Sequence, residues 1–143
     1  MILLLIGMST LAFNIRPVNA SGTIYVRADG SIDPSDAPIQ RDGDVYTLTG
    51  NITSFVDGII VERDNIVVDG DGLLVQGTSA PDSSGIDLSG RKNVTIKNAE
   101  IRAFWTGIYI AESSSNNIVG NDLTNNKNGI GMLFSPHNSI VEN

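Results

Sequence analysis

A repeat of about 22 residues in the C-terminal half constrains the fold of this 143-residue chain more than any other feature. Three segments share this spacing: GIDL at residues 85–88, GIYI at 107–110 and GIGM at 129–132. A set of isoleucines keeps the same step, namely Ile96, Ile118 and Ile140. A period of this length is typical of solenoid proteins, in which each repeat buries its apolar face against the next repeat. The sequence therefore predicts a stack of similar coils.

Each repeat is expected to contain three short strands. Ile108 and Ile110 flank Tyr109, and this alternation has the period of two that marks a strand with one buried face. Ile96 and Ile101 are five residues apart, which would place them on opposite faces of one continuous strand, so a corner is expected between them. Three strands and three corners per repeat describe one coil of a parallel β-helix. We therefore expect an all-β fold.

Asparagines recur one coil apart in the C-terminal half. Ten of the 14 asparagines follow residue 90; Asn116 and Asn138 form one aligned pair, and Asn121 and Asn143 form another. Equal positions in stacked coils lie about 4.8 Å apart, so we expect their side-chain amides to hydrogen-bond to one another in ladders. Most of these asparagines are therefore interpreted as structural.

The repeat is looser upstream. Val68 and Ile96 are separated by six residues more than the period, and we expect the excess to form a loop at residues 77–84. Residues 46–61 are predicted to form an earlier coil, so that residues 46–143 make up the β-helix. Residues 21–45 contain one strand candidate, at 23–26, and are expected to cover the end of the solenoid, because uncovered strand edges promote aggregation.

Residues 1–20 are predicted to be a secretory signal peptide. Residues 1–13 are nearly all apolar but too few to span a bilayer, and Val18, Asn19 and Ala20 form an acceptable cleavage site. A short buried strand is the alternative. The signal peptide predicts a secreted, cell-surface or periplasmic protein without a transmembrane span in its mature chain. Because the sequence stops within a coil, at Asn143, we also expect further C-terminal coils.

Charge is distributed unevenly along the chain. Residues 21–90 carry 12 acidic and three basic side chains, whereas residues 91–143 carry four acidic and five basic ones. Since no basic patch is present in the sequence, nucleic acid is not expected as a partner. Cysteine is absent, so disulfide bonds do not contribute to the fold.

Several segments resemble one known family. NVTIKN at residues 93–98, NNIVGN at 116–121 and NNKNGI at 125–130 resemble the repeats of the NosD-like right-handed parallel β-helix proteins, which many archaea and bacteria export. TIYVRADG at residues 23–30, followed by QRDGD at 40–44, resembles the beginning of archaeal members. The resemblance covers about residues 23–143 and implies a right-handed β-helix.

The function implied by this resemblance is less specific than the fold. The family name comes from a periplasmic protein tied to copper delivery for nitrous-oxide reductase, whereas related domains occur in carbohydrate-binding, sugar-cleaving and surface-layer proteins. A shared fold does not carry one function across such a group, so individual residues have to be considered.

Copper is one cofactor that the resemblance suggests, and it would require imidazole or sulfur ligands. His137 is the only histidine and cysteine is absent. His137 aligns with Ser115 and Asn93 at steps of one coil, which indicates a polar corner, and Met132 takes the inward position of Ile110. A periplasmic copper-binding or metal-delivery protein is therefore an alternative for which this chain supplies few ligands.

Carboxylates suggest a second kind of site. Asp64, Asp69 and Asp71 form the densest group and are weak candidates for a Ca²⁺ site. Asp69 and Asp71 belong to the segment DGDG, which is first of all a turn sequence. Cleavage of a glycosidic bond needs two carboxylates that converge from different strands. A polysaccharide lyase or hydrolase with its active site on further C-terminal coils is an alternative, and no catalytic residue is assigned in this chain.

Outward aromatic residues point most directly to a ligand. Tyr109 is predicted to face outward, and Trp105 lies at the corner before Gly107. Aromatic faces are natural platforms for sugar rings, and Asp87, one coil before Tyr109, can accept hydrogen bonds from hydroxyls. Packing of Trp105 over the coil edge is the alternative. We therefore expect an exported, non-catalytic scaffold or carbohydrate-interaction module whose partner is a polysaccharide or a cell-surface component.

Two sequons add candidate modification sites. NIT at residues 51–53 and NVT at 93–95 make Asn51 and Asn93 acceptors for N-glycosylation in a host that glycosylates exported proteins. As patterns of three residues, both are weak signals.

Overall fold

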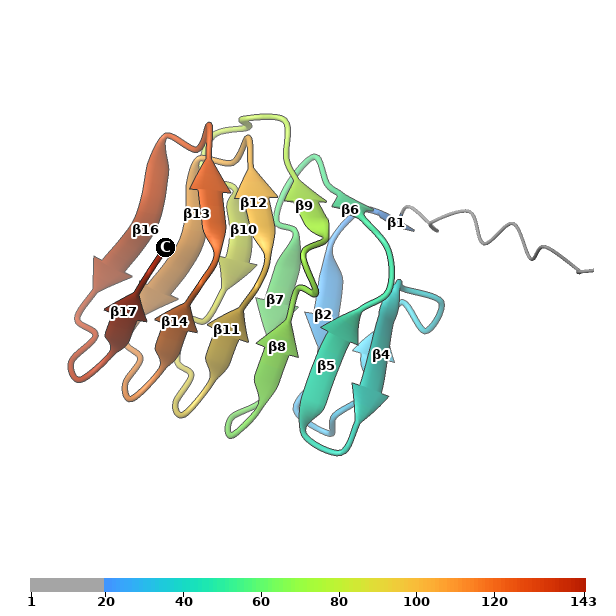
Figure 1. The fold of residues 1–143 in the computed structure, drawn as a ribbon, viewed down its shortest axis with the longest axis horizontal. Coiled ribbons are helices and arrows are strands. Elements are labelled where there is room, and N and C mark those ends of the chain that lie inside the picture. The colour runs from blue at the N-terminus through green and yellow to red at the C-terminus, as the bar shows by residue number, and fades with distance from the viewer. Residues whose placement is uncertain (1–19) are drawn as a thin grey trace, which may run out of the picture.

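The structure is a computed structural model that describes residues 20–143. Within this range the chain forms a β-solenoid whose coils are stacked from β1 to β17, and every regular element is a strand (Figure 1). The described part accordingly contains no helix that is long and apolar enough to cross a membrane. The predicted signal peptide falls almost wholly on residues 1–19, which lie outside the described residues.

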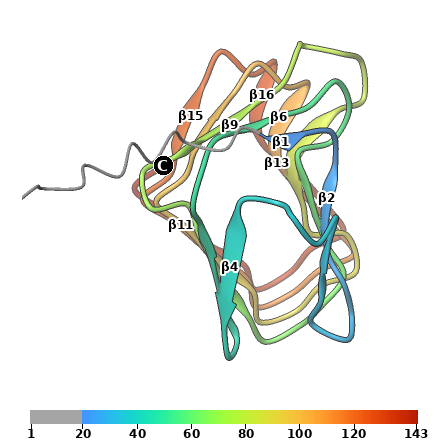
Figure 2. The ribbon, with the colours of Figure 1, turned by 90° about the vertical axis from the view of Figure 1, so that its right-hand side faces the viewer.

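Three sheets, named A, B and C here, form the sides of the solenoid, and the coils superpose when viewed along the stack (Figure 2). Sheet A contains, in spatial order, β1 (Ala20–Ser21), β6 (Ile52–Thr53), β9 (Leu74–Gln76), β12 (Glu100–Arg102) and β15 (Asp122–Thr124). Sheet B contains β3 (Ile32–Asp33), β2 (Ile24–Val26), β7 (Ile59–Val61), β10 (Ser84–Asp87), β13 (Thr106–Ala111) and β16 (Asn128–Leu133). Sheet C contains β4 (Ile39–Asp42), β5 (Val45–Leu48), β8 (Val67–Asp69), β11 (Thr95–Lys97), β14 (Asn117–Val119) and β17 (Ser139–Val141).

Strands of successive coils pair in parallel and in the register that the repeat predicts. Ile96 pairs with Ile118, and Ile118 pairs with Ile140. In sheet B, Ile86 pairs with Ile108 across the same interval. These pairs confirm the predicted parallel β-helix with about 22 residues in each of its regular coils.

The additional residues of the earlier coil are divided between two corners. β8 pairs with β11 at a sequence offset of 28 (Val68 with Ile96), β9 pairs with β12 at an offset of 26, and β10 pairs with β13 at an offset of 22 (Ser84 with Thr106). Two residues therefore enlarge the corner between β8 and β9, and four lengthen the loop between β9 and β10. The predicted loop at residues 77–84 is in the right place, but assigning it all six residues was wrong, because spacing alone does not show which corner holds an insertion.

The core consists of stacked aliphatic side chains from all three sheets. In sheet B, Ile24, Ile59, Ile86 and Ile108 form one column, and none is more than 1% exposed. Full burial of a side chain of this size stabilises the fold by about 2 kcal/mol. The column explains why isoleucine recurs at the same position of successive coils: each coil buries its own apolar face only against its neighbours.

Asparagine side chains close the corners between coils. Asn116 Oδ1 accepts a hydrogen bond from the Val94 N–H in the preceding coil at 2.9 Å, and its Nδ2 donates to the Arg91 carbonyl oxygen at 3.1 Å. Asn121 makes the corresponding pair of bonds at the next corner. The expected amide-to-amide ladder is therefore mainly a ladder of side-chain to backbone bonds, although Asn121 also donates to Asn143 Oδ1 at 2.8 Å.

Short antiparallel strands border the N-terminal end of the stack. β3 pairs with β2 and β4 pairs with β5, whereas the other strand pairs of residues 20–143 are parallel. The connection from β3 to β4 crosses the end that faces the viewer in Figure 2, and Ile39 joins the core with 7% exposure. Residues before Tyr46 thus contribute both a strand in coil register, β2, and a segment across the end of the stack.

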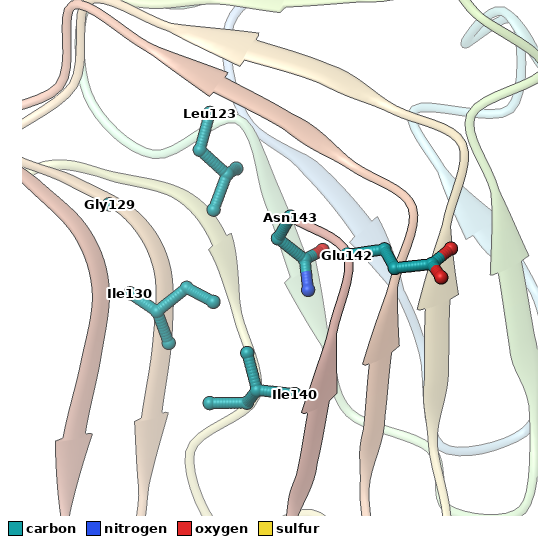
Figure 3. A pocket seen from close by; sticks show the side chains of 6 residues that line it. All are labelled: Leu123, Gly129, Ile130, Ile140, Glu142 and Asn143. Carbon is teal, nitrogen blue, oxygen red and sulfur yellow. The ribbon is translucent and has the colours of Figure 1, made fainter.

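Apolar side chains of the last coil line an open pocket at the other end of the stack. Leu123, Ile130 and Ile140 lie around it, and its cavity volume is about 450 Å³ (Figure 3). Met132 pairs with Ile110, which confirms its predicted register, yet it is 46% exposed because no described strand lies beyond β16. Met132 thus has the inward register of a core position and lies at the open end of the described stack.

Candidate functional site

A groove lies on the outer face of sheet B, over β10, β13 and β16. Its cavity volume is about 540 Å³, and its lining includes Trp105, Tyr109 and Asp87. Two further carboxylates, those of Asp57 and Asp82, also line it. The structure thus brings together all three residues predicted for carbohydrate binding and adds two acidic residues to them.

Two columns of side chains form the walls of this groove. One column contains Asp87, Tyr109 and Gly131, which pair directly in successive strands. The other column consists of the residues that precede the four aligned glycines, namely Asp57, Ser84, Thr106 and Asn128. Because each coil repeats the same corner, one repeat position supplies a whole wall.

The ring of Tyr109 lies beside a glycine in the next coil. A Cβ added to Gly131 would lie 3.3 Å from Tyr109 Cδ2 and 3.1 Å from Thr106 Cγ2, both shorter than ordinary van der Waals contacts. Glycine therefore leaves a shallow depression next to a half-exposed aromatic ring. A flat, partly apolar group such as a pyranose ring fits a surface of this kind.

Trp105 is held at its corner by both neighbouring coils. Its backbone N–H donates to Ser83 Oγ in the preceding coil at 3.2 Å, and Lys127 Nζ in the following coil lies 3.1 Å from the ring centroid. A cation over an aromatic face is attracted by the quadrupole of the ring. Trp105 therefore packs against the coil edge and also lines the groove, and a sugar that stacks on the covered face has to displace Lys127.

Asp57 is a groove residue that the sequence analysis did not identify. Its Oδ1 accepts a hydrogen bond from the Ser84 N–H at 2.7 Å. Burial raises the pKa of Asp57, the bond from Ser84 lowers it, and the negative charge of Asp87 raises it, so that the net shift is upward. The signal that identifies it is the alignment of Gly58 with Gly85, which places Asp57 one coil before Ser84.

The sequence also matches a family model over most of its length. Residues 22–143 match the model described as the periplasmic copper-binding protein NosD. The chain belongs to the NosD family. No curated protein and no solved structure matches it. Membership confirms the resemblance noted in the repeats, and a family of periplasmic proteins is consistent with an exported chain.

The NosD family is described as copper-binding, and a copper site in this member would need imidazole or sulfur ligands. His137 is exposed and lies in a corner with a φ of 59°. Among residues 20–143, no three His, Cys, Asp or Glu side chains are grouped so that they could hold a metal ion. The donor set of the described coils therefore does not fit a copper centre.

The structure does not gather the three aspartates proposed as a weak metal site around one point. Asp64 precedes β8 and accepts a hydrogen bond from Arg91 Nη1 at 3.4 Å. Asp69, at the end of β8, lies 2.9 Å from Lys97 Nζ and accepts a bond from the Asp71 N–H at 3.0 Å. Burial alone would raise the pKa of Asp69, but the bonds from Lys97 and Asp71 contribute to a net lowering. These contacts are those of ion pairs and a turn.

The two sequon asparagines take part in contacts between coils. Asn51 Oδ1 accepts a hydrogen bond from the Leu74 N–H at 3.1 Å. Asn93 is exposed, and its Nδ2 donates to Asn65 Oδ1 at 2.9 Å. Glycosylation of either residue stays a prediction, and at Asn93 it would replace one of the two hydrogens of the nitrogen that bonds to Asn65.

Proposed function

We propose that this NosD family member is an exported, non-catalytic β-solenoid that binds polysaccharide in the groove of sheet B. The observation that carries the proposal is the column of Asp87, Tyr109 and Gly131, which places a carboxylate, an aromatic ring and a depression side by side. Together these groups offer a stacking surface and hydrogen-bond acceptors for hydroxyls.

The expected affinity of a single groove is weak. One aromatic platform and one or two hydrogen bonds support dissociation constants in about the millimolar range, which corresponds to about 4 kcal/mol. Repeated sugar units along a polymer raise the effective concentration and therefore the retention of the chain on a polysaccharide.

Retention on immobilised polysaccharides tests the proposal. We expect Tyr109→Ala and Trp105→Ala each to reduce retention, with an unchanged β-sheet spectrum in circular dichroism. Tyr25→Ala is the matched control, because Tyr25 lies in the same column of sheet B as Tyr109 and is not part of the groove lining. Tyr25 pairs with Ile60, which in turn pairs with Asp87.

Two outcomes would contradict the proposal. One is a parent protein that is retained on no glycan, and the other is a Tyr109→Ala variant that is retained as strongly as Tyr25→Ala. Release of reducing or unsaturated sugar ends during the incubation would instead favour the polysaccharide lyase or hydrolase alternative.

Copper binding is the second candidate function, and the family description is the observation that favours it. Calorimetric titration of the chain with Cu²⁺, compared with the His137→Ala variant, tests it. Because the described coils offer no fitting donor set, we expect weak binding without a defined stoichiometry. Stoichiometric binding that His137→Ala abolishes would establish the copper function.

Export is the third part of the proposal. Cleavage after Ala20 would leave Ser21 as the N-terminus, and the family match begins directly after it, at residue 22. N-terminal sequencing of protein from the periplasm or the medium is expected to begin at Ser21. Recovery of the chain only in the cytoplasm, with Met1 intact, would contradict export.

A further inference from the structure

The charge of the groove narrows the class of sugar that it can accept. Asp57, Asp82 and Asp87 all line it, and none of the three belongs to an ion pair within residues 20–143. The ion pairs of the described chain involve other carboxylates, namely those of Asp33, Asp44, Glu62, Asp64, Asp69 and Glu100. A ligand in the groove therefore meets three carboxylates whose charge no protein cation neutralises by direct contact.

The hydrogen-bonding capacity of these carboxylates is only partly used. Asp87 Oδ1 accepts bonds from the Ser89 N–H at 2.7 Å and from Ser89 Oγ at 2.6 Å. Asp57 Oδ1 accepts one bond, from the Ser84 N–H. The second oxygen of each carboxylate has no partner among the described residues. Since an ionised carboxylate only accepts hydrogen bonds, the groove favours a ligand that is rich in donors.

Lys127 shows which kind of group the aromatic part of the groove attracts. Its ammonium lies 3.1 Å from the centroid of the Trp105 ring, and its own side chain is exposed. Because the Lys127 side chain is exposed, it can move from the ring into solvent, and an ammonium group of a ligand can take its place on the same face of Trp105. The electron-rich ring and the carboxylates favour the same charge on a ligand.

We propose that the groove binds sugars that carry a free ammonium group, so that its ligand is a polysaccharide containing unacetylated amino sugars. This inference rests on the proposed function and adds a substrate class to it. The ammonium group lies between the carboxylates and the Trp105 face, while the pyranose ring lies beside Tyr109 and over Gly131. Polymers of uronic acids or sulfated sugars are repelled by the three carboxylates.

Trp105 provides a direct readout, because it is the only tryptophan of the chain. We would titrate the full chain at about pH 6 with glucosamine oligomers, N-acetylglucosamine oligomers of equal length, and oligogalacturonate. Tryptophan fluorescence should respond to the glucosamine oligomer at about tenfold lower concentration than to the acetylated one, which corresponds to about 1.4 kcal/mol. Oligogalacturonate should not bind.

Variants assign the preference to particular residues. Asp87→Asn should lower the affinity for the glucosamine oligomer more than that for the acetylated oligomer, because asparagine keeps an acceptor oxygen for hydroxyls and loses the charge. Asp36→Asn is the matched control, since Asp36 is an exposed carboxylate outside the groove lining. Lys127→Ala should increase the affinity for the glucosamine oligomer, because it removes the competing ammonium from Trp105.

Two further titrations separate sugar recognition from charge alone. Tetralysine supplies ammonium groups without a sugar ring, and CaCl₂ supplies a bare divalent cation. Equal affinity for tetralysine and the glucosamine oligomer, or displacement of the oligomer by stoichiometric Ca²⁺, would overturn the inference. Equal affinity for the glucosamine and acetylated oligomers would also overturn it while leaving the proposed function intact. Failure of every oligomer to bind would contradict both.

Discussion

The carbonyl oxygen of Gly107 lies 2.5 Å from the point at which a Cβ on Gly85 would be placed. The same relationship joins Gly58 to the Gly85 carbonyl oxygen at 2.5 Å and Gly107 to the Gly129 carbonyl oxygen at 2.6 Å. None of these glycines has the positive φ that often requires glycine. The repeated glycine therefore reflects close contact between coils, because any side chain there would collide with the backbone of the next coil.

Gly85→Ala is accordingly expected to destabilise the fold by about 2–3 kcal/mol, since the backbone of the neighbouring coil has to shift. Gly129→Ala is the matched control: a Cβ at Gly129 would meet only Leu123, with Cδ1 at 3.9 Å. Urea denaturation followed by circular dichroism measures both variants. Equal loss of stability in the two variants would contradict the explanation by coil contact.

A second prediction concerns the corner asparagines. Asn116 is 1% exposed and bonds to the Val94 N–H and the Arg91 carbonyl oxygen of the preceding coil. Asn116→Ala leaves the buried Val94 N–H without a partner, whereas the Arg91 carbonyl oxygen keeps the bond from the Ser114 N–H, so a loss of about 1–3 kcal/mol is expected. Asn117→Ala is the control, because Asn117 lies half-buried in β14. A midpoint of urea denaturation that is the same for both variants would show that the corner bonds do not stabilise the stack.

A third prediction concerns a strained corner. Glu112 is exposed and has a φ of 51°, while Gly90, in the same corner one coil earlier, has a φ of 71°. The left-handed conformation costs a non-glycine residue roughly 1–2 kcal/mol, and glycine loses roughly 0.5–1 kcal/mol of chain entropy on folding. Glu112→Gly should therefore stabilise the protein by about 0.5–1 kcal/mol.

Ala111→Gly provides the comparison for that variant, because Ala111 belongs to β13 and lacks the positive φ. It should destabilise the protein by about 0.5–1 kcal/mol, since only the entropy loss remains. Thermal unfolding measures both variants. A decrease in the melting temperature of Glu112→Gly would contradict the strain argument.

The sequence predicted the register of the coils because each regular coil repeats the same contacts at the same interval. Ile96, Ile118 and Ile140 therefore pair as the spacing requires. The outward position of Tyr109 followed from its alternation with buried isoleucines, and the structure leaves it half-exposed in β13. Periodicity is a strong signal wherever no insertion interrupts it.

The parts of the groove that escaped prediction lie where the period is interrupted. The longer loop between β9 and β10 carries Asp82 and lies within the 27 residues that separate Asp57 from Ser84, whereas equivalent residues of the regular coils are 22 apart. The contact of Lys127 with Trp105 joins residues at the regular interval, but it depends on the direction of two long side chains at a corner. Spacing predicts that such residues are neighbours and does not predict how their side chains meet.

The last prediction concerns how stability depends on pH at Asp57. Burial, together with the nearby charge of Asp87, raises the pKa of Asp57 above its usual value of 3.8, despite the bond from Ser84. An acid whose pKa is raised by folding binds more protons in the native state than in the unfolded state, so its ionised form opposes folding. Asp57→Asn keeps an oxygen that can accept the Ser84 bond and removes the charge. The variant should therefore be more stable than the parent at neutral pH.

This advantage should shrink as the pH falls through the raised pKa of Asp57 and should vanish below about 3.8, where the carboxyl is protonated in both states. Asp69→Asn should behave in the opposite way, because folding lowers the pKa of Asp69 below 3.8 and the ionised carboxylate pairs with Lys97. The variant should be less stable than the parent at neutral pH, and this deficit should disappear as the pH falls through the lowered pKa. Urea denaturation of both variants and the parent at a series of pH values measures the two differences. A stability difference for Asp57→Asn that grows on acidification would contradict the burial of Asp57, since it would mean that folding favours the ionised carboxylate.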